Sequence, residues 1–280
     1  MILNYASSPN LQLSHMSLAC HMEQLSHCNF SSHTLTSLNL ISYPYPTRGP
    51  LLFPNSLLLP ALTYLAINRF SFRSGDDGYA NPFFAFKSLN TLVILYCEVF
   101  DKKNLSISSV SLINLSILPS IECPYKFELS TPNLRRFYFM GPPLQKLCGR
   151  NSNCNLSSVK HVKIDFPFWA CVKSPSILFS WLHDLALMES FTICFKTLQI
   201  LDLIPDSSKI DFPYLHNLKL LKIETHDLSL LQDGMGDFLL QNAPSAKKVI
   251  IHLPLPKSFA DIRRKMRELY FSVPDNSNYM

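Results

Sequence analysis

Apolar residues recur along this chain in a spacing of three and then two. In the stretch SHTLTSLNL they stand at Leu35, Leu38 and Leu40. An amphipathic helix repeats its apolar residues every three or four positions and a half-buried strand alternates them, so neither element accounts for the whole stretch. With other apolar residues admitted, the pattern returns in PALTYLAI, KSLNTLVI, VSLINLSI, PNLRRFYF, SSVKHVKI, KTLQILDL, HNLKLLKI and PSAKKVII. The sequence therefore contains nine similar units in series.

The spacing between these units predicts a fold. Their first apolar residues are Leu35, Leu62, Leu89, Leu112, Leu134, Val159, Leu198, Leu218 and Ala246. Seven of the eight intervals measure 20 to 28 residues and the interval after Val159 measures 39, and leucine-rich repeats are about 20–29 residues long. One unit cannot bury its own apolar edge, so short strands are expected to pair in parallel around a shared core. We predict an α/β leucine-rich repeat solenoid, with a curved parallel sheet on the concave side and loops and few helices on the convex side.

Three helices are predicted between or after the strands. The first lies in SPSILFSWLHDLALMES, with Ser174 as N-cap, Pro175 at the first helical position and apolar residues along one face. The second covers residues 228–241 and is weakened by two internal glycines. The third, SFADIRRKMRELYF, begins after Ser258 and either closes the end of the solenoid or stays solvated.

Several segments resemble a known family. CNFSSHTLTSLNL, FKSLNTLVILYCEVF, LSSVKHVKIDF, LHNLKLLKIE and FLLQNAPSAKKVII resemble the leucine-rich repeat region of plant F-box/LRR proteins, and the last is similar to their FBD-type ending. In that family an N-terminal F-box docks on the adaptor of a cullin-RING ubiquitin ligase, and the repeats hold the protein to be ubiquitinated. The resemblance implies the substrate-binding part of an SCF-type ubiquitin-ligase receptor, with a target protein as its partner. The cysteine pattern, which favours reduced thiols, indicates the cytoplasm or nucleus as the location.

The F-box itself is not expected in this sequence. Its Leu-Pro opening and Arg-Trp-x-x-Leu-Trp ending have no counterpart here, because both tryptophans, Trp169 and Trp181, lie far downstream. The expected organisation is a degenerate first repeat or cap over 1–34, about nine repeats over 35–257, and a capping helix with a tail over 258–280. A cullin-RING adaptor is therefore expected as a partner only if an F-box exists upstream in a longer product.

Composition and charge indicate how large a core the chain can form and which classes of partner are expected. At 280 residues, 47% hydrophobic and 16% charged, the chain has material for a large folded core. Its formal charge of +5 is scattered along the sequence without an RNA-binding motif, and no apolar run is long enough to cross a membrane, so neither nucleic acid nor membrane is an expected partner. An extracellular or membrane-associated recognition domain is the alternative, favoured only by sequons at Asn29, Asn104, Asn114 and Asn155. A third possibility is a non-functional truncated gene product.

Catalysis, cofactors and metals are not expected. The sequence lacks the Gly-x-Ser-x-Gly, His-Glu-x-x-His and Walker A motifs. Eight cysteines show no CxxC spacing, which favours reduced, buried thiols, and Cys148 and Cys154 are expected to stay free. Four histidines spaced by six residues cannot converge on one zinc ion from a single helix or strand. These are His15, His21, His27 and His33, with Cys20 and Cys28 beside them.

The candidate binding residues are those that point away from the core along the predicted strands. Early strands present neutral side chains and later strands present charged ones. Arginine and tyrosine are favoured interface anchors, so Arg136 and Tyr138 are predicted as the centre of a hot spot; ordinary solvated strand residues are the alternative. The candidates for protein binding on the concave face are Tyr64, Asn68, Arg136, Tyr138, His161, Lys163, Asp165, Asp202, Lys222 and Glu224. The last strand adds Lys248, Ile250 and His252 to this ladder.

Overall fold

The structure is a computed structural model of the chain. It describes residues 14–20, 30–43, 51–54, 57–100, 104–120, 125–144, 146–147, 156–166, 175–203, 212–231 and 236–254. Within these residues the protein is α/β, with one large parallel sheet of ten strands and few helices.

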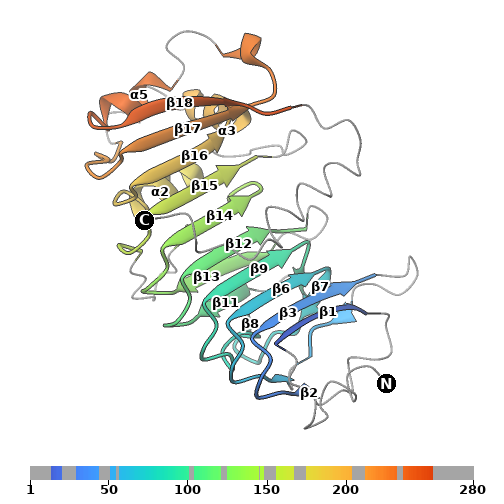
Figure 1. Cartoon of the computed structure of the whole chain (residues 1–280). Helices are drawn as coiled ribbons and strands as arrows, with labels where there is room; N and C mark the ends of the chain where they lie inside the picture. The colour runs from blue at the N-terminus through green and yellow to red at the C-terminus, as the bar shows by residue number, and fades with distance from the viewer. Residues whose placement is uncertain are drawn as a thin grey trace.

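The ten strands lie side by side in the order in which the chain makes them, as the colour gradient of Figure 1 shows. They are β1 (His15–Cys20), β3 (Ser37–Ser42), β6 (Tyr64–Asn68), β9 (Thr91–Leu95), β12 (Asn114–Leu118), β14 (Arg136–Met140), β15 (His161–Asp165), β16 (Ser190–Cys194), β17 (Leu220–Thr225) and β18 (Lys247–His252). Every neighbouring pair is parallel. Parallel neighbours need a return connection between them, and the segments between the sequence motifs provide it.

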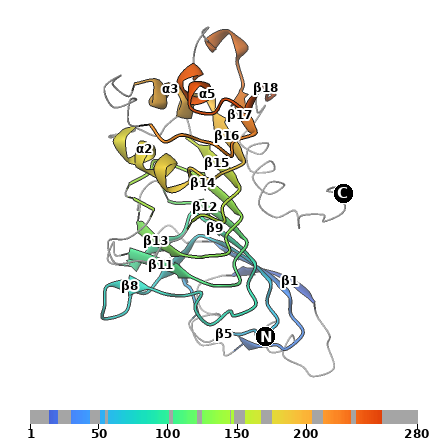
Figure 2. The same cartoon turned by 90° about the vertical axis from the view of Figure 1, so that its left-hand side faces the viewer.

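Eight further strands form three small sheets in the return segments. Two of these sheets have three strands, in the orders β10-β7-β4 and β13-β11-β8, and the third pairs β2 with β5. Their bounds are β2 (Phe30–Ser31), β4 (Leu51–Leu52), β5 (Leu57–Leu58), β7 (Phe70–Phe72), β8 (Tyr79–Ala80), β10 (Glu98–Val99), β11 (Asn104–Ser108) and β13 (Lys126–Ser130). In the side view of Figure 2, β8, β11, β13, α2 (Pro175–Asp184) and α3 (Phe195–Asp202) lie on one side of the ten-stranded sheet.

A recurring backbone contact sets the register of the large sheet. Before β9, the N–H groups of Asn90 and Thr91 both donate to the carbonyl of Thr63, at 2.9 Å each. The same paired contact recurs before β3, β6, β12, β14, β15, β16 and β17. The residue directly before each strand is therefore held beside its counterpart in the next unit, about one strand spacing of 4.8 Å away.

The core lies between the large sheet and the return segments. In the eight strands from β3 to β17 of the large sheet, the second and fourth residues, such as Leu115 and Ile117 of β12, are buried there. Burying each such side chain contributes about 1.5–3 kcal/mol, which makes this row the main stabilising feature of the fold. Trp181 of α2 is fully buried, and its ring centroid lies 4.8 Å from that of Phe139 in β14.

Eight of the nine predicted strands are confirmed, and the one predicted at KTLQILDL is wrong. The motif KTLQILDL forms helix α3, because Leu198 and Leu201 stand at a spacing that also suits one face of a helix. Cys194 caps this helix through its Sγ, which accepts a hydrogen bond from the backbone N–H of Thr197.

Strand β16, in the segment MESFTIC, was not among the predicted strands. Met188 occupies the place of the first leucine, since its N–H donates to the carbonyl of Leu185 at 3.0 Å, as that of Leu62 does to Leu59 at 3.1 Å. With Met188 in that place, the 39-residue and 20-residue intervals become 29 residues from Val159 and 30 residues to Leu218. The sequence pattern did not reveal this unit, because methionine and phenylalanine replace the first two leucines of the motif.

Of the three predicted helices, one is confirmed, one is wrong as a single helix, and one lies outside the described residues. The first is confirmed as α2, which ends at Asp184, earlier than the apolar pattern suggests. Residues 228–241 do not form the single helix predicted: the described part contains η2 (Leu228–Leu230) and the short helix α5 (Asp237–Gln241), which begins after Gly236 in a left-handed conformation at φ 78°. The predicted N-cap Ser174 and the predicted helix after Ser258 lie outside the described residues.

Within the described residues no helix is long and apolar enough to cross a membrane. Two cysteines, Cys97 and Cys194, are described as free thiols, and Cys148 and Cys154 lie outside the described part.

Candidate functional site

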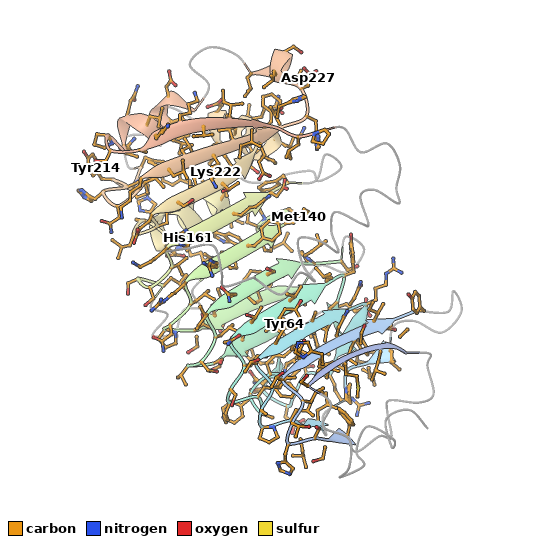
Figure 3. The ribbon with its side chains drawn as sticks, in the orientation of Figure 1. Tyr64, Met140, His161, Tyr214, Lys222 and Asp227 are labelled. Atoms are coloured by element: carbon orange, nitrogen blue, oxygen red, sulfur yellow. The ribbon has the colours of Figure 1, made fainter. Side chains whose placement is uncertain are left out.

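One face of the large sheet points away from the core. We call it the outer face and define it as the first, third and fifth residues of each of the ten strands, which the strand register aligns in rows. Figure 3 labels four of its residues, Tyr64, Met140, His161 and Lys222. Because the strands pair in chain order, side chains from successive units stand next to each other on this face.

Nine of the ten candidate residues lie on the outer face. The register aligns Arg136 with His161 and Tyr138 with Lys163 on the neighbouring strands β14 and β15. Asp202 is the exception: it belongs to helix α3 and not to a strand, so its assignment to the binding ladder is wrong.

The assignments on the last strand are also wrong. The register aligns Lys248 with Leu221 and Ile250 with Ile223, whose side chains are buried in the core. Lys248, Ile250 and His252 therefore stand on the core side of β18, and Lys248 Nζ lies 3.4 Å from Asp237 Oδ1 of α5. The unit that contains β18 is one residue shorter between its turn and its strand, which reverses the phase of the alternation.

The N-terminal part of the outer face carries an apolar cluster that the sequence analysis missed. Its members are buried although they point away from the core: Tyr64, Ala66, Val93, Leu95, Leu118 and Met140. Tyr96 and Tyr138 pack against this cluster, so Tyr138 is half-buried rather than freely solvated. Unbroken apolar runs such as LVIL in β9 were the available signal, because strands buried on both faces lose the polar alternation.

A partly buried ion pair crosses the C-terminal part of the outer face. Lys163 Nζ of β15 lies 2.7 Å from Glu224 Oε2 of β17, so the lysine reaches across β16. Both side chains are largely buried, with 22% and 15% exposed. Lys163 Nζ also lies 5.3 Å from the ring centroid of Tyr138, within cation–π range. The pair therefore ties three strands of the candidate surface together.

Asp165 and Cys194 lie next to this ion pair. Burial raises the pKa of Asp165, while the hydrogen bond with Cys194 and the charge of Lys163 act in the opposite direction. Burial also raises the pKa of Cys194 to about 12. The thiol is therefore protonated at neutral pH and is a poor nucleophile.

Positive charge converges on His161. Burial is the largest cause of its lowered pKa, followed by the charge of Arg136, with further lowering by Lys160 and Lys222. Glu189 acts in the opposite direction. Cations from β14, the residue before β15 and β17 are thus within electrostatic reach of one imidazole.

A second charged feature runs along the edge where the strands begin. We call it the leading row and define it as Arg135, Lys160, Glu189 and Lys219, the residues directly before β14, β15, β16 and β17. Glu189 bridges two lysines, with Lys160 Nζ at 2.7 Å from Oε1 and Lys219 Nζ at 2.8 Å from Oε2. These contacts lower the pKa of Glu189 to about 2. The row was missed because Glu189 becomes the neighbour of Lys160 and Lys219 only once β16 is placed correctly.

No group of three or more His, Cys, Asp or Glu side chains able to hold a metal occurs among the described residues; His21, His27 and Cys28 lie outside them. Asn114, a sequon residue, is engaged on the outer face: its Nδ2 donates to Thr91 Oγ1 at 3.0 Å, and its Oδ1 accepts from Arg136 at 3.4 Å.

Comparison with known proteins assigns no relative to the chain. No protein-family model, curated protein or solved structure matches it.

Proposed function

We propose that this chain is a leucine-rich repeat solenoid that recognises another protein through its outer face, as the substrate-binding part of an SCF-type ubiquitin-ligase receptor does. The ten strands in chain order and the paired backbone contact before them support the repeat assignment. A repeat array of this kind presents an extended surface whose side chains come from many units, which suits the binding of a protein target.

The main support for the proposal is the alignment of β14 with β15. The register brings Arg136 and Tyr138 from one unit beside His161 and Lys163 from the next, on a face directed away from the core. Arg136 and His161 are exposed. Beside them, Tyr138 is half-buried and the Lys163–Glu224 ion pair is largely buried. An exposed arginine next to a half-buried aromatic ring is the composition typical of interface hot spots.

Attachment to a ubiquitin ligase would require an F-box joined to this chain. A cullin-RING adaptor is a partner only in that case, and the cytoplasm or nucleus is then the compartment in which the protein acts. Expression of the full transcript product followed by co-purification of the adaptor tests this part of the proposal separately from target binding.

Target binding is tested with the double variant Arg136→Ala/His161→Ala. Both side chains are exposed, so the variant should fold normally while its capture of the target weakens by about 2 kcal/mol or more, as loss of a hot spot does. The measurement is quantitative affinity purification of target from cells, with the intact chain as bait. Tyr138 is left in place because its ring packs against the apolar cluster, and its removal would mix stability with binding.

The matched control is Arg73→Ala/Lys126→Ala, which removes two exposed cations from outside the outer face. It should capture as much target as the original chain. Equal capture by both double variants, with unchanged thermal unfolding, would reject the outer face as the binding surface.

A further inference from the structure

The leading row has a charge pattern that differs sharply between the two halves of the sheet. Before β3, β6, β9 and β12 the corresponding residues are Thr36, Thr63, Asn90 and Ile113, all uncharged. Before β14 to β17 they are Arg135, Lys160, Glu189 and Lys219. The charged residues of this row thus lie in the half of the sheet that also carries Arg136, His161 and Lys222 on the adjoining outer face.

The backbone holds this row in place. The N–H groups of Lys160 and His161 donate to the carbonyl of Arg135 at 2.9 and 3.0 Å, and those of Glu189 and Ser190 to the carbonyl of Lys160 at 2.7 and 2.9 Å. The N–H of Lys219 continues the series to Glu189 at 2.9 Å. The side chains of the row therefore project from a fixed ladder, with a spacing of about 4.8 Å between units.

Cations outnumber carboxylates along this edge. Glu189 is the single acid of the row and is shared between Lys160 and Lys219. Within the part of the chain that the structure describes, no carboxylate lies within ion-pair distance of Arg135, Arg136, Lys222 or Lys247. Lys247, the first residue of β18, extends the positive edge, since its N–H donates to the carbonyl of Lys219 at 2.9 Å.

Glu189 shows which ligand chemistry this edge accepts. Its two carboxylate oxygens each receive one lysine ammonium, at 2.7 and 2.8 Å, from units on either side. Both lysines remain largely exposed, at 52% and 73% of their side chains, so a ligand can reach them. A second carboxylate arriving from outside would meet the same ammonium groups and the neighbouring Arg135 and Arg136.

We propose that the leading row, together with Arg136 and Lys222, binds a short Asp/Glu-rich segment of the target protein. Charge complementarity favours this occupant, because several clustered cations with one internal carboxylate form a surface that attracts and orients an acidic chain. The inference rests on the proposed function and adds to it the chemical class of the segment that is recognised. Glu189 then acts as an internal competitor that keeps Lys160 and Lys219 in position when no target is bound.

The test uses the full chain and a fluorescein-labelled twelve-residue peptide of alternating Asp and Glu, with binding measured by fluorescence anisotropy. The Lys160→Ala/Lys219→Ala variant should bind the peptide about tenfold more weakly. Glu189→Gln should bind it about two- to threefold more tightly, because the internal competitor is gone. Raising the salt concentration should weaken binding, as screening requires.

Three controls make the test specific. A peptide of alternating Asn and Gln should not bind, and Arg73→Ala/Lys126→Ala, which removes the same net charge elsewhere, should bind the acidic peptide normally. An equal loss in this control variant, or weaker binding by Glu189→Gln, would overturn the inference. Tighter binding of a twelve-residue oligouridine than of the acidic peptide would overturn it as well, in favour of nucleic acid.

The two proposals fail in distinguishable ways. Target capture that depends on Arg136 and His161, combined with no binding of the acidic peptide, would reject the acidic segment and leave the proposed function standing. Row-dependent peptide binding with target capture unaffected by Arg136→Ala/His161→Ala would reject the proposed function, and with it the target as the source of the segment.

Discussion

At the scale of the residue, charge on this protein is organised by the register of its strands. Lys160, Glu189 and Lys219 are separated by about thirty positions in the sequence, yet they form one continuous ion-pair bridge because each precedes a strand of the same sheet. Lys163 and Glu224 are joined in the same way across β16. Their types could be read from the sequence, but their partners could not, because pairing depends on where each strand begins.

The lowered pKa of Glu189 predicts a pH dependence of stability. Its folded-state pKa of about 2 lies below the ordinary value of 4.5 for a glutamate, so the stabilisation is complete above the ordinary value and is lost as pH falls toward the folded-state value. The difference in free energy of unfolding between the original chain and Glu189→Gln should therefore be largest near neutral pH and shrink steadily below about pH 4.5. Urea unfolding at a series of pH values measures this difference. A difference that stays constant down to about pH 2.5 would contradict the assignment of the ion pairs.

At the scale of the element, the sequence pattern predicted strands better than it distinguished strands from helices. The L-x-x-L-x-L spacing marks eight strands correctly, and in seven of them the apolar residues of the motif fill the same inward positions; β18 has the opposite phase. It fails at Leu198, where the three-residue spacing serves a helix that begins directly after β16. The backbone hydrogen bonds of Glu189 and Ser190 to the carbonyl of Lys160 resolve this ambiguity, and they join residues that are about thirty positions apart in the sequence.

Trp181 packs helix α2 against the aromatic core. The indole lies among the rings of Phe127, Phe137 and Phe139, at centroid distances of 6.0, 5.9 and 4.8 Å. Trp181→Ala should therefore lower the free energy of unfolding by about 3–5 kcal/mol, through lost burial and the cavity left behind. Phe84→Ala removes a ring that is 64% exposed and should change stability by less than about 0.5 kcal/mol. Equal effects of the two substitutions in urea unfolding would show that α2 does not pack as described.

At the scale of the whole molecule, the ordered sequence of units predicts both a parallel sheet in chain order and the face that is turned away from the core. The change from neutral to charged side chains along that face is also visible in the sequence, and the structure places it on β14 to β17. The buried apolar cluster around Val93 and Leu95 was not predicted, because inward alternation alone assigns those positions to solvent. The reversed phase of β18 escaped for a related reason: it results from one residue fewer in a turn.

The proposed function requires a protein partner to bind on the outer face of β14 to β17. Site-specific photo-crosslinking in cells tests it most directly, with a benzophenone amino acid placed at His161 on that face or at Lys126 on β13, both exposed. A defined cross-linked partner is expected from position 161 and should be lost in the Arg136→Ala background, and position 126 should give no such product. Cross-linking of the same partner from position 126 and not from position 161 would reject the outer face as the binding surface.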